Sequence, residues 1–224
     1  MKQVSILVLM LALIGTSQAA VIINHNGSSI NYGTSWDSPS VQVEEVLQSL
    51  DAEFTGDVHL TLVNGFAVND FESWLGNGVT SVILEELAGY KNNTTFGWYD
   101  ANNTGNNGQL FSGADGVGAS TEVNFSAPLN FGFYIEPNGI SSNAMYSQNE
   151  LNTHSDYQVA IFKVEELVDT YILGWEDLDL NGGSGGDRDY QDMIVRLTIK
   201  SVPEPGTLLM LLSGFMLLGA RRKL

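Results

Sequence analysis

Short runs of β-prone residues, separated by glycine and asparagine turns, most constrain what this chain can fold into. Several such runs along one chain are typical of an all-β sandwich or barrel. The clearest run, 193–200, places Met193, Val195, Leu197 and Ile199 at alternate positions with polar residues between them. This alternation predicts a strand with one buried face. The sequence therefore predicts a mainly β domain, an antiparallel β-sandwich of jelly-roll type.

We expect ten strands and one packed amphipathic helix. The strands are Val21–Asn24, Val58–Val63, Ser81–Leu87, Thr94–Tyr99, Gln109–Phe111, Thr121–Phe125, Asn130–Ile135, Tyr157–Val164, Thr170–Trp175 and Met193–Lys200. The helix covers Pro39–Leu50, where Ser38 can cap the first turn and apolar residues recur at helical spacing. A second short helix is possible near Val68–Leu75. The asparagine- and glycine-rich stretch 102–108 indicates a turn.

The two ends of the chain are predicted to lie outside this domain. Residues 1–19 combine Lys2, an apolar core and small residues before Ala20, which is the pattern of a secretory signal peptide. The alternative, an N-terminal membrane anchor, is disfavoured because the apolar run is short. We expect a signal peptide over 1–19, one extracellular domain over 20–200, and a sorting and anchor segment over 201–224.

The C-terminal segment has three parts. They are the polar motif Val202, Pro203, Glu204, Pro205, the apolar run Thr207–Ala220, and the basic cluster Arg221, Arg222, Lys223. As a helix the apolar run would span about 21 Å, less than the roughly 30 Å of a bilayer core. It has no polar face, however, and the basic side chains can reach the interface. We therefore predict a C-terminal transmembrane helix, with the preceding domain on the outer side.

Charge and cysteine content narrow the function. Between the two ends, the chain carries 25 acidic and 5 basic residues, a net charge of −20, and it has no cysteine. Nucleic acid is excluded as a partner because phosphate contacts need lysine and arginine. The charge also disfavours holding anionic lipid surfaces. It suits a soluble extracellular protein and divalent cations, and solubility alone explains it equally well.

The loop between Trp175 and Met193 concentrates the candidate ligands. Six carboxylates and one asparagine fall within 17 residues: Glu176, Asp177, Asp179, Asn181, Asp187, Asp189 and Asp192. Such carboxylates repel one another unless neutralised, and Ca²⁺ takes six to eight oxygen ligands in flexible geometry. The loop begins like an EF-hand, but Arg188 stands at the last ligand position. We predict a Ca²⁺ loop of another design; the alternative is a solvated acidic hairpin with Arg188 paired to a neighbour.

Enzyme motifs are weak. The stretch 182–186 fits G-x-S-x-G, but no histidine follows it and a strand is predicted next, unlike a nucleophile elbow. His25, His59 and His154 show no zinc spacing. Four aromatic residues could form a sugar platform, although packing in a core is the commoner role: Trp74, Trp98, Tyr99 and Trp175. We expect no catalytic residues and no enzyme activity.

Two resemblances add to this reading. The C-terminal layout resembles the PEP-CTERM sorting signal of Gram-negative bacteria, which implies a transient anchor recognised and cut near Pro203 by an exosortase. The pair 174–178 (GWEDL) and 185–192 (GGDRDYQD), with weaker pieces from residue 80 onward, resembles an uncharacterised bacterial extracellular domain. That resemblance assigns the motif to Glu176, Asp177, Asp187, Asp189 and Asp192. This chain departs from the motif of that domain in two ways: it has Gln191 in place of the usual asparagine, and its loop is longer.

The sequence thus predicts a non-catalytic exported protein of the cell surface or extracellular biofilm matrix, with a Ca²⁺-binding loop. The expected partners are an exosortase-type protease, the membrane through the C-terminal helix before processing, and extracellular polysaccharide. The alternative is a secreted carbohydrate-binding lectin or a glycoside-active enzyme.

Overall fold

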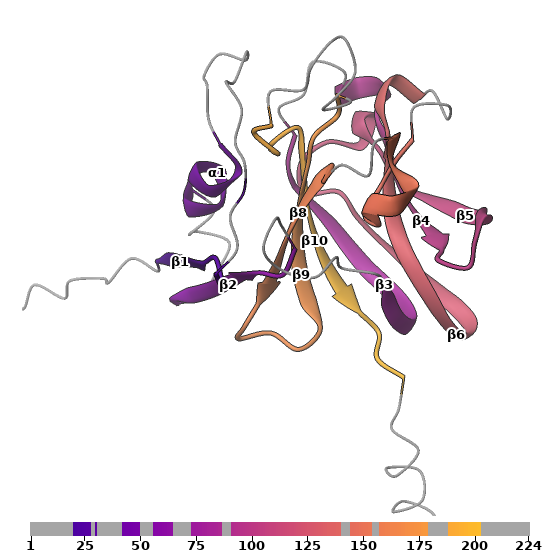
Figure 1. Cartoon of the computed structure of the whole chain (residues 1–224), viewed down its shortest axis with the longest axis horizontal. Helices are drawn as coiled ribbons and strands as arrows, with labels where there is room; N and C mark the ends of the chain where they lie inside the picture. The colour runs from indigo at the N-terminus through magenta and orange to yellow at the C-terminus, as the bar shows by residue number, and fades with distance from the viewer. Residues whose placement is uncertain are drawn as a thin grey trace, which may run out of the picture.

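The computed structural model describes residues 20–27, 30, 42–49, 56–64, 73–86, 91–139, 144–153, 157–178 and 188–202 (Figure 1). The strands within this part are β1 (Val21–Asn24), β2 (Val58–Leu62), β3 (Trp74–Glu85), β4 (Thr95–Asp100), β5 (Asn103–Ser112), β6 (Ser120–Glu136), β7 (Met145–Tyr146), β8 (Val159–Val164), β9 (Thr170–Trp175) and β10 (Met193–Ile199). One α-helix, α1 (Val43–Ser49), and the short 3₁₀ turns η2 (Lys91–Asn93), η3 (Gly113–Asp115), η4 (Pro137–Gly139) and η6 (Asn149–Leu151) complete the described elements.

All of these strands hydrogen-bond in one mixed sheet. Their order is β1-β2-β8-β9-β10-β3-β6-β4-β5, and β7 pairs with β6 off this path. Strands β1 and β2 run parallel, with Val21 opposite Val58, whereas the other neighbours are antiparallel. The mainly β prediction is therefore confirmed, but the purely antiparallel one is wrong at β1 and β2. The two-sheet sandwich stays a prediction.

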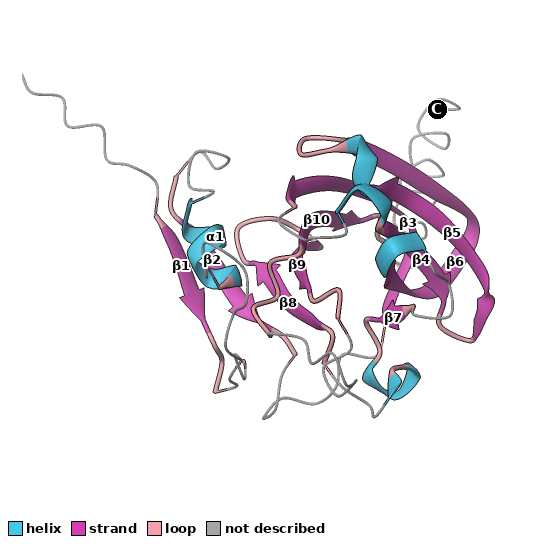
Figure 2. Cartoon of the chain, turned by 90° about the horizontal axis from the view of Figure 1, so that it is seen from above, coloured by secondary structure: helices cyan, strands magenta, loops and turns pink. Residues whose placement is uncertain are grey.

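The long strand β6 lets the sheet change direction. Its first part pairs with β3 and its last part pairs with β4 and β7, so that Phe131 lies opposite both Trp74 and Asp100. Seen from above, the sheet bends around a common centre (Figure 2). That centre is an aromatic-rich cluster in which Phe96 stacks on Phe133 at 5.6 Å and meets Trp175 edge to face at 6.1 Å. Offset and edge-to-face rings of this kind add to the stability that burial supplies.

A second apolar cluster lies on the other face of β2, β8, β9 and β10. Helix α1 contributes Val43, Val46 and Leu47 to it, at the spacing that puts them on one helix face. Strands β8, β9 and β10 contribute to both clusters, and most of their residues are buried. The middle of the sheet is therefore covered on both faces, which fixes the hairpin β9–β10 that carries the acidic loop.

Several sequence predictions differ from the structure in their bounds. Strand β9 has the bounds expected, and β10 and β8 are within two residues of them. The stretch 102–108, predicted as a turn, is mostly strand β5. The two predicted strands 121–125 and 130–135 are one strand, β6. Residues 74 and 75, placed in a possible helix, begin β3.

Both chain ends that carry apolar segments fall outside the described residues, namely 1–19 and 203–224. The predicted signal helix and C-terminal transmembrane helix lie there. Within the described part of the chain, no helix has the length and apolar character needed to cross a membrane.

Candidate metal site

Four acidic side chains meet where β9 and β10 separate. Glu176 and Asp177 follow the last residue of β9, and Asp192 precedes the first residue of β10. Asp189 approaches from the loop. Because Met193 lies opposite Trp175 in the ladder, the residues just beyond this pair are brought together by the hairpin itself. Carboxylates far apart in the loop sequence therefore share one small volume.

These side chains are buried, which is unusual for ionisable groups. Glu176 is 0 % exposed, Asp189 is 2 % exposed, and Asp177 and Asp192 are each 5 % exposed. The solvated hairpin considered from the sequence does not fit these four residues. Arg188 also forms no ion pair with any residue that the structure describes.

Backbone groups orient the carboxylates. The Arg188 N–H donates to Glu176 Oε2 at 2.8 Å, and the Asp177 N–H donates to Asp192 Oδ2 at 2.7 Å. The Glu176 N–H donates to the Gln158 carbonyl at 3.0 Å, which extends the pairing of β8 and β9 up to the cluster. Hydrogen bonds from the backbone therefore orient the carboxylates of Glu176 and Asp192.

Asp189 sits between two residues with left-handed backbone. Arg188 has φ 59° and Tyr190 has φ 58°, a conformation that non-glycine residues adopt at a cost. The Tyr190 hydroxyl donates to the Tyr157 carbonyl at 3.0 Å, and the ring packs in the second apolar cluster. The Asp189 carbonyl accepts from the Val43 N–H at 2.8 Å. These contacts hold the strained segment in place and connect the cluster to helix α1.

The cluster is electrostatically unfavourable when all its members are ionised. Burial raises the pKa of Asp192 well above its usual value, and the neighbouring carboxylates of Asp177, Glu176 and Asp189 raise it further. The hydrogen bond from the Asp177 N–H acts in the opposite direction and is outweighed. Like charges in a low-dielectric site disfavour the charged form. A bound cation or a bound proton would remove this cost.

The geometry fits a cation with oxygen ligands. One ligand oxygen from each of Glu176, Asp189 and Asp192 lies within 4.8 Å of the other two. Since Ca²⁺–oxygen distances are 2.3–2.6 Å, two ligands of one ion lie at most about 5 Å apart. The three side chains could therefore share a Ca²⁺ ion without rearranging the backbone.

Gln191 adds a neutral oxygen that the sequence analysis did not count as a ligand. Its side chain is 1 % exposed, and its Nε2 donates to Asp189 Oδ2 at 2.8 Å. Its Oε1 is buried and accepts no hydrogen bond from the described residues. The two atoms of an amide are about 2.2 Å apart, so this oxygen lies within about 5 Å of Asp189 Oδ2. Glutamine at position 191, where the resembling motif has asparagine, still supplies an amide oxygen, and that shared amide was the signal in the sequence that could have identified Gln191 as a ligand.

The remaining predicted ligands, Asp179, Asn181 and Asp187, lie outside the described residues, as do Ser184 and His154. His25 pairs with Glu44 at 3.4 Å and His59 with Glu166 at 2.5 Å, and neither glutamate is one of the four acids of the cluster. Of the proposed sugar platform, three aromatic side chains are buried and only Trp98 is half-buried, stacked edge-on against Phe125.

Comparison with known families places the chain among exported proteins that carry a sorting signal. The model of the PEP-CTERM protein-sorting motif matches residues 201–223. A second model, described as a domain of unknown function (DUF4114), matches residues 125–200, which include β6 from residue 125 onward, β7 to β10 and the acidic cluster. The resemblance read from the sequence began near residue 80, so its first pieces fall outside this match. No curated protein and no solved structure matches the chain.

The sorting motif carries consequences for the whole protein. It implies export, transient anchoring in a membrane before processing, and recognition by exosortase-type machinery. Of its predicted residues, Val202 is described, and Pro203, Glu204, Pro205, Arg221 and Arg222 lie beyond the described part.

Proposed function

We propose that this protein is a non-catalytic component of the cell surface or extracellular matrix, whose domain is stabilised by Ca²⁺ at the acidic cluster. The observation that carries the proposal is the burial of Glu176, Asp189 and Asp192 with ligand oxygens within 4.8 Å of one another. The raised pKa of Asp192 and the buried Gln191 Oε1 support it.

Export makes such a site useful. Extracellular modules commonly bind Ca²⁺ with Kd values of about 10⁻⁴–10⁻³ M. A domain without cysteine has no disulfide to stabilise it outside the cell, so a cation that joins the ends of β9 and β10 takes over part of that role. Extracellular polysaccharide is the partner we propose for the domain, and cleavage near Pro203 by an exosortase-type protease is the proposed processing step.

Titration calorimetry with CaCl₂ tests the metal site. The chain without its signal peptide, stripped with EDTA and dialysed, is expected to bind Ca²⁺, and to bind Mg²⁺ more weakly because Mg²⁺ demands a tighter octahedral site. E176Q should weaken binding, whereas E136Q, a glutamine substitution of a partly buried glutamate on β6, should not. Absence of heat for the unmodified protein, with its folded state verified by circular dichroism, would sink the proposal.

Glycan-array binding followed by a hydrolysis assay tests the absence of catalysis. Binding without turnover agrees with a surface or matrix protein. Hydrolysis of any bound glycan would replace this proposal with the glycoside-active alternative.

A further inference from the structure

The end of the domain from which the C-terminal segment leaves carries exposed apolar side chains. Leu75, at the start of β3, is 60 % exposed, and Leu167 and Val168, in the turn between β8 and β9, are 43 % and 82 % exposed. We call these three residues the tail-side surface. They make up half of the large exposed apolar side chains in the described residues, and the others, Ile22, Val117 and Leu151, stand singly on separate elements.

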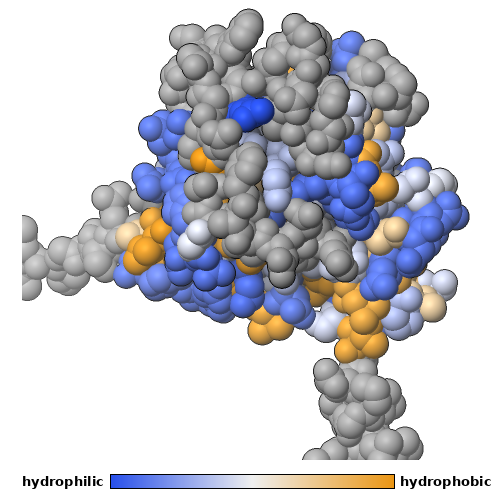
Figure 3. Space-filling model, in the orientation of Figure 1, coloured by the Kyte–Doolittle hydropathy of each residue, from blue (hydrophilic) through white to orange (hydrophobic). Residues whose placement is uncertain are grey.

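Hydrogen bonds place this surface directly beside the exit of the chain. The Ile199 N–H donates to the Asp169 carbonyl at 2.9 Å, and the Ser201 hydroxyl contacts the Asp169 carboxylate, so the β8–β9 turn touches the end of β10. On the other side, the Asn77 N–H donates to the Lys200 carbonyl at 2.8 Å, two residues from Leu75. Figure 3 shows hydrophobic atoms along the lower edge of the domain, next to the departing segment.

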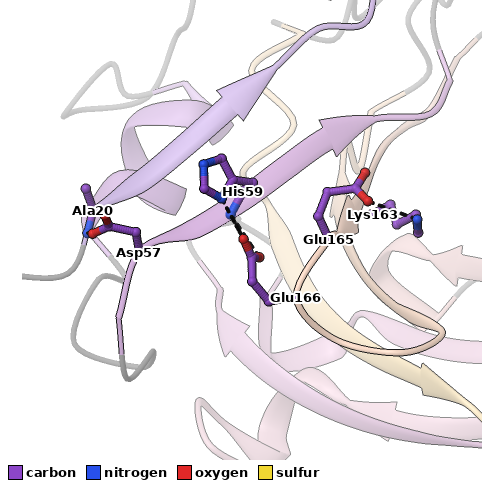
Figure 4. Close-up of polar contacts among 6 residues, drawn as sticks. All are labelled: Ala20, Asp57, His59, Lys163, Glu165 and Glu166. Atoms are coloured by element: carbon purple, nitrogen blue, oxygen red, sulfur yellow. Dashed lines mark hydrogen bonds and ion pairs between the residues drawn. The ribbon is translucent and has the colours of Figure 1, made fainter.

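Three acidic residues near this surface have a basic side chain beside them, although the domain as a whole is strongly acidic. Glu165 pairs with Lys163 at 3.0 Å, and Glu166 lies 2.5 Å from His59 Nδ1 (Figure 4). Glu122 pairs with Lys200. These are three of the four ion pairs formed among the described residues. Asp169, next to Val168, forms no ion pair among the described residues and contacts the Ser201 hydroxyl. The tail-side end therefore presents apolar groups next to one carboxylate that has no basic partner there.

The sorting motif brings this end close to a membrane. Residues through Ser201 are bound to the domain, and the predicted apolar segment begins at Thr207, which leaves five residues between them. Five extended residues span about 17 Å at most. The headgroup layer on one side of a bilayer takes up about 5–7 Å of that length. The anchored domain therefore stays within contact range of the lipid surface and has this end turned towards it.

We propose that, in the anchored precursor, the tail-side surface rests on the lipid bilayer with Leu75, Leu167 and Val168 inserted at the headgroup boundary. This rests on the anchoring that the sorting motif implies, and it does not depend on Ca²⁺. Apolar side chains at the boundary gain from leaving water. The net negative charge of the domain opposes binding to an anionic surface, so the contact exists only while the tail holds the domain there. Release of the tail releases the surface.

Single labels on a cysteine-free chain test the contact. An environment-sensitive NBD fluorophore is attached to one introduced cysteine in each of three variants, L75C, V168C and the control V117C. Each variant is the chain without its signal peptide, reconstituted in phosphatidylethanolamine–phosphatidylglycerol vesicles. Val117 is a matched control because it is also 60 % exposed and lies in a loop bonded to Ile83, at the other end of β3 from Leu75. Near-UV circular dichroism checks that each labelled protein is folded.

We expect a blue-shifted emission for the labels at 75 and 168, with quenching by nitroxide-labelled lipid, and neither effect at 117. Equal exposure of all three labels to aqueous iodide would overturn the proposal, as would equal quenching of 117 and 168 by lipid. Protection of 75 and 168 only in membranes that contain the sorting protease, and not in pure lipid vesicles, would also overturn it and assign the surface to that protein.

Discussion

Asp192→Asn separates a metal site from a merely structural cluster of buried acids. Asparagine keeps the shape of the side chain and an oxygen that can accept the Asp177 N–H, but it removes one charge from among Asp177, Glu176 and Asp189. In EDTA, the variant should therefore melt at or above the temperature of the unmodified protein. Each unit by which the pKa of Asp192 is raised costs the ionised folded state about 1.4 kcal/mol, and the substitution removes that cost.

Calcium should reverse the order of the two proteins. At a Ca²⁺ concentration of about 100 Kd, binding stabilises the unmodified domain by about 2.7 kcal/mol. For a domain of this length, that corresponds to a rise in Tm of about 5–11 °C. If the loss of one ligand weakens binding about 100-fold, the same Ca²⁺ concentration adds only about 0.4 kcal/mol to the variant, a rise of about 1–2 °C.

Differential scanning calorimetry in EDTA and in CaCl₂ measures both effects on the same samples. E136Q serves as the control, since it changes a carboxylate outside the cluster and should keep the full Ca²⁺-dependent rise. An unmodified protein with the same Tm in both buffers would refute the reasoning. So would a D192N protein that keeps the entire rise, because the charge of Asp192 would then play no part in binding.

Four further predictions follow from the described contacts. Because the pKa of Asp192 is raised in the folded state, its contribution to stability in EDTA is full below the unfolded pKa of about 3.9 and is lost as pH rises through the folded pKa. The urea midpoint of the unmodified protein should therefore fall over that pH range, and the midpoint of D192N should not. Gly174→Ala places a Cβ about 2.5 Å from the Tyr190 carbonyl and 2.6 Å from Val43 Cγ2, so it should cost about 1–3 kcal/mol in urea unfolding and weaken Ca²⁺ binding; an unchanged midpoint would contradict the close packing. Asn64→Ala removes the partner of the Val159 carbonyl and the Ile161 N–H, and should lower the unfolding free energy by about 2–5 kcal/mol. If the signal peptide ends at Ala19, the new ammonium group of Ala20 lies beside Asp57 Oδ1 at 3.0 Å, so D57N should lower the Tm of the processed chain but not that of an N-acetylated one (Figure 4).

The sequence predicted the strands in the middle of the sheet better than the strands at its edge. Strands β9 and β10 alternate or run apolar, and packing on both faces agrees with that local pattern. Of strand β5, only the last part was predicted, as 109–111; the first part was read as a turn because asparagine and glycine normally favour turns. It is held as an edge strand by β4, where Gly108 leaves room for Trp98: a Cβ there would lie 2.7 Å from Trp98 Nε1. Tertiary packing thus overrides local preference at this edge.

The sequence predicted two strands, 121–125 and 130–135, where β6 is continuous, and Pro128, which cannot donate to a ladder, lies between them. In the structure, the pairing with β3 shifts between Gly76 and Gly78, so residues 125–128 have no registered partner in β3 and the proline interrupts nothing. The parallel pairing of β1 and β2 was also missed, since strand direction depends on the course of the connecting chain and not on the residues within a strand.

The residues of the acidic cluster could be predicted from the sequence, but the burial of their side chains could not. The motif identified Glu176, Asp177, Asp189 and Asp192, and the hairpin brings these four together. Their burial could not be predicted from the motif, because it depends on contacts of Glu176 and Asp189 with segments outside the hairpin. The contributions of the Val43 N–H and the Gln158 carbonyl come from distant segments, so no local pattern could reveal them.

The position of β10 has a mechanical consequence. The C-terminal segment continues directly from this strand, which lies between β9 and β3 in the middle of the sheet. A pull on the tail acts along β10, so it loads the hydrogen bonds to β9 and to β3 in shear, all at once. A pull on an edge strand would instead break the bonds of a single ladder one after another. A domain suspended by a central strand resists being drawn apart by its own anchor. Flow or drag on an anchored molecule would therefore extend the linker before it unravels the fold.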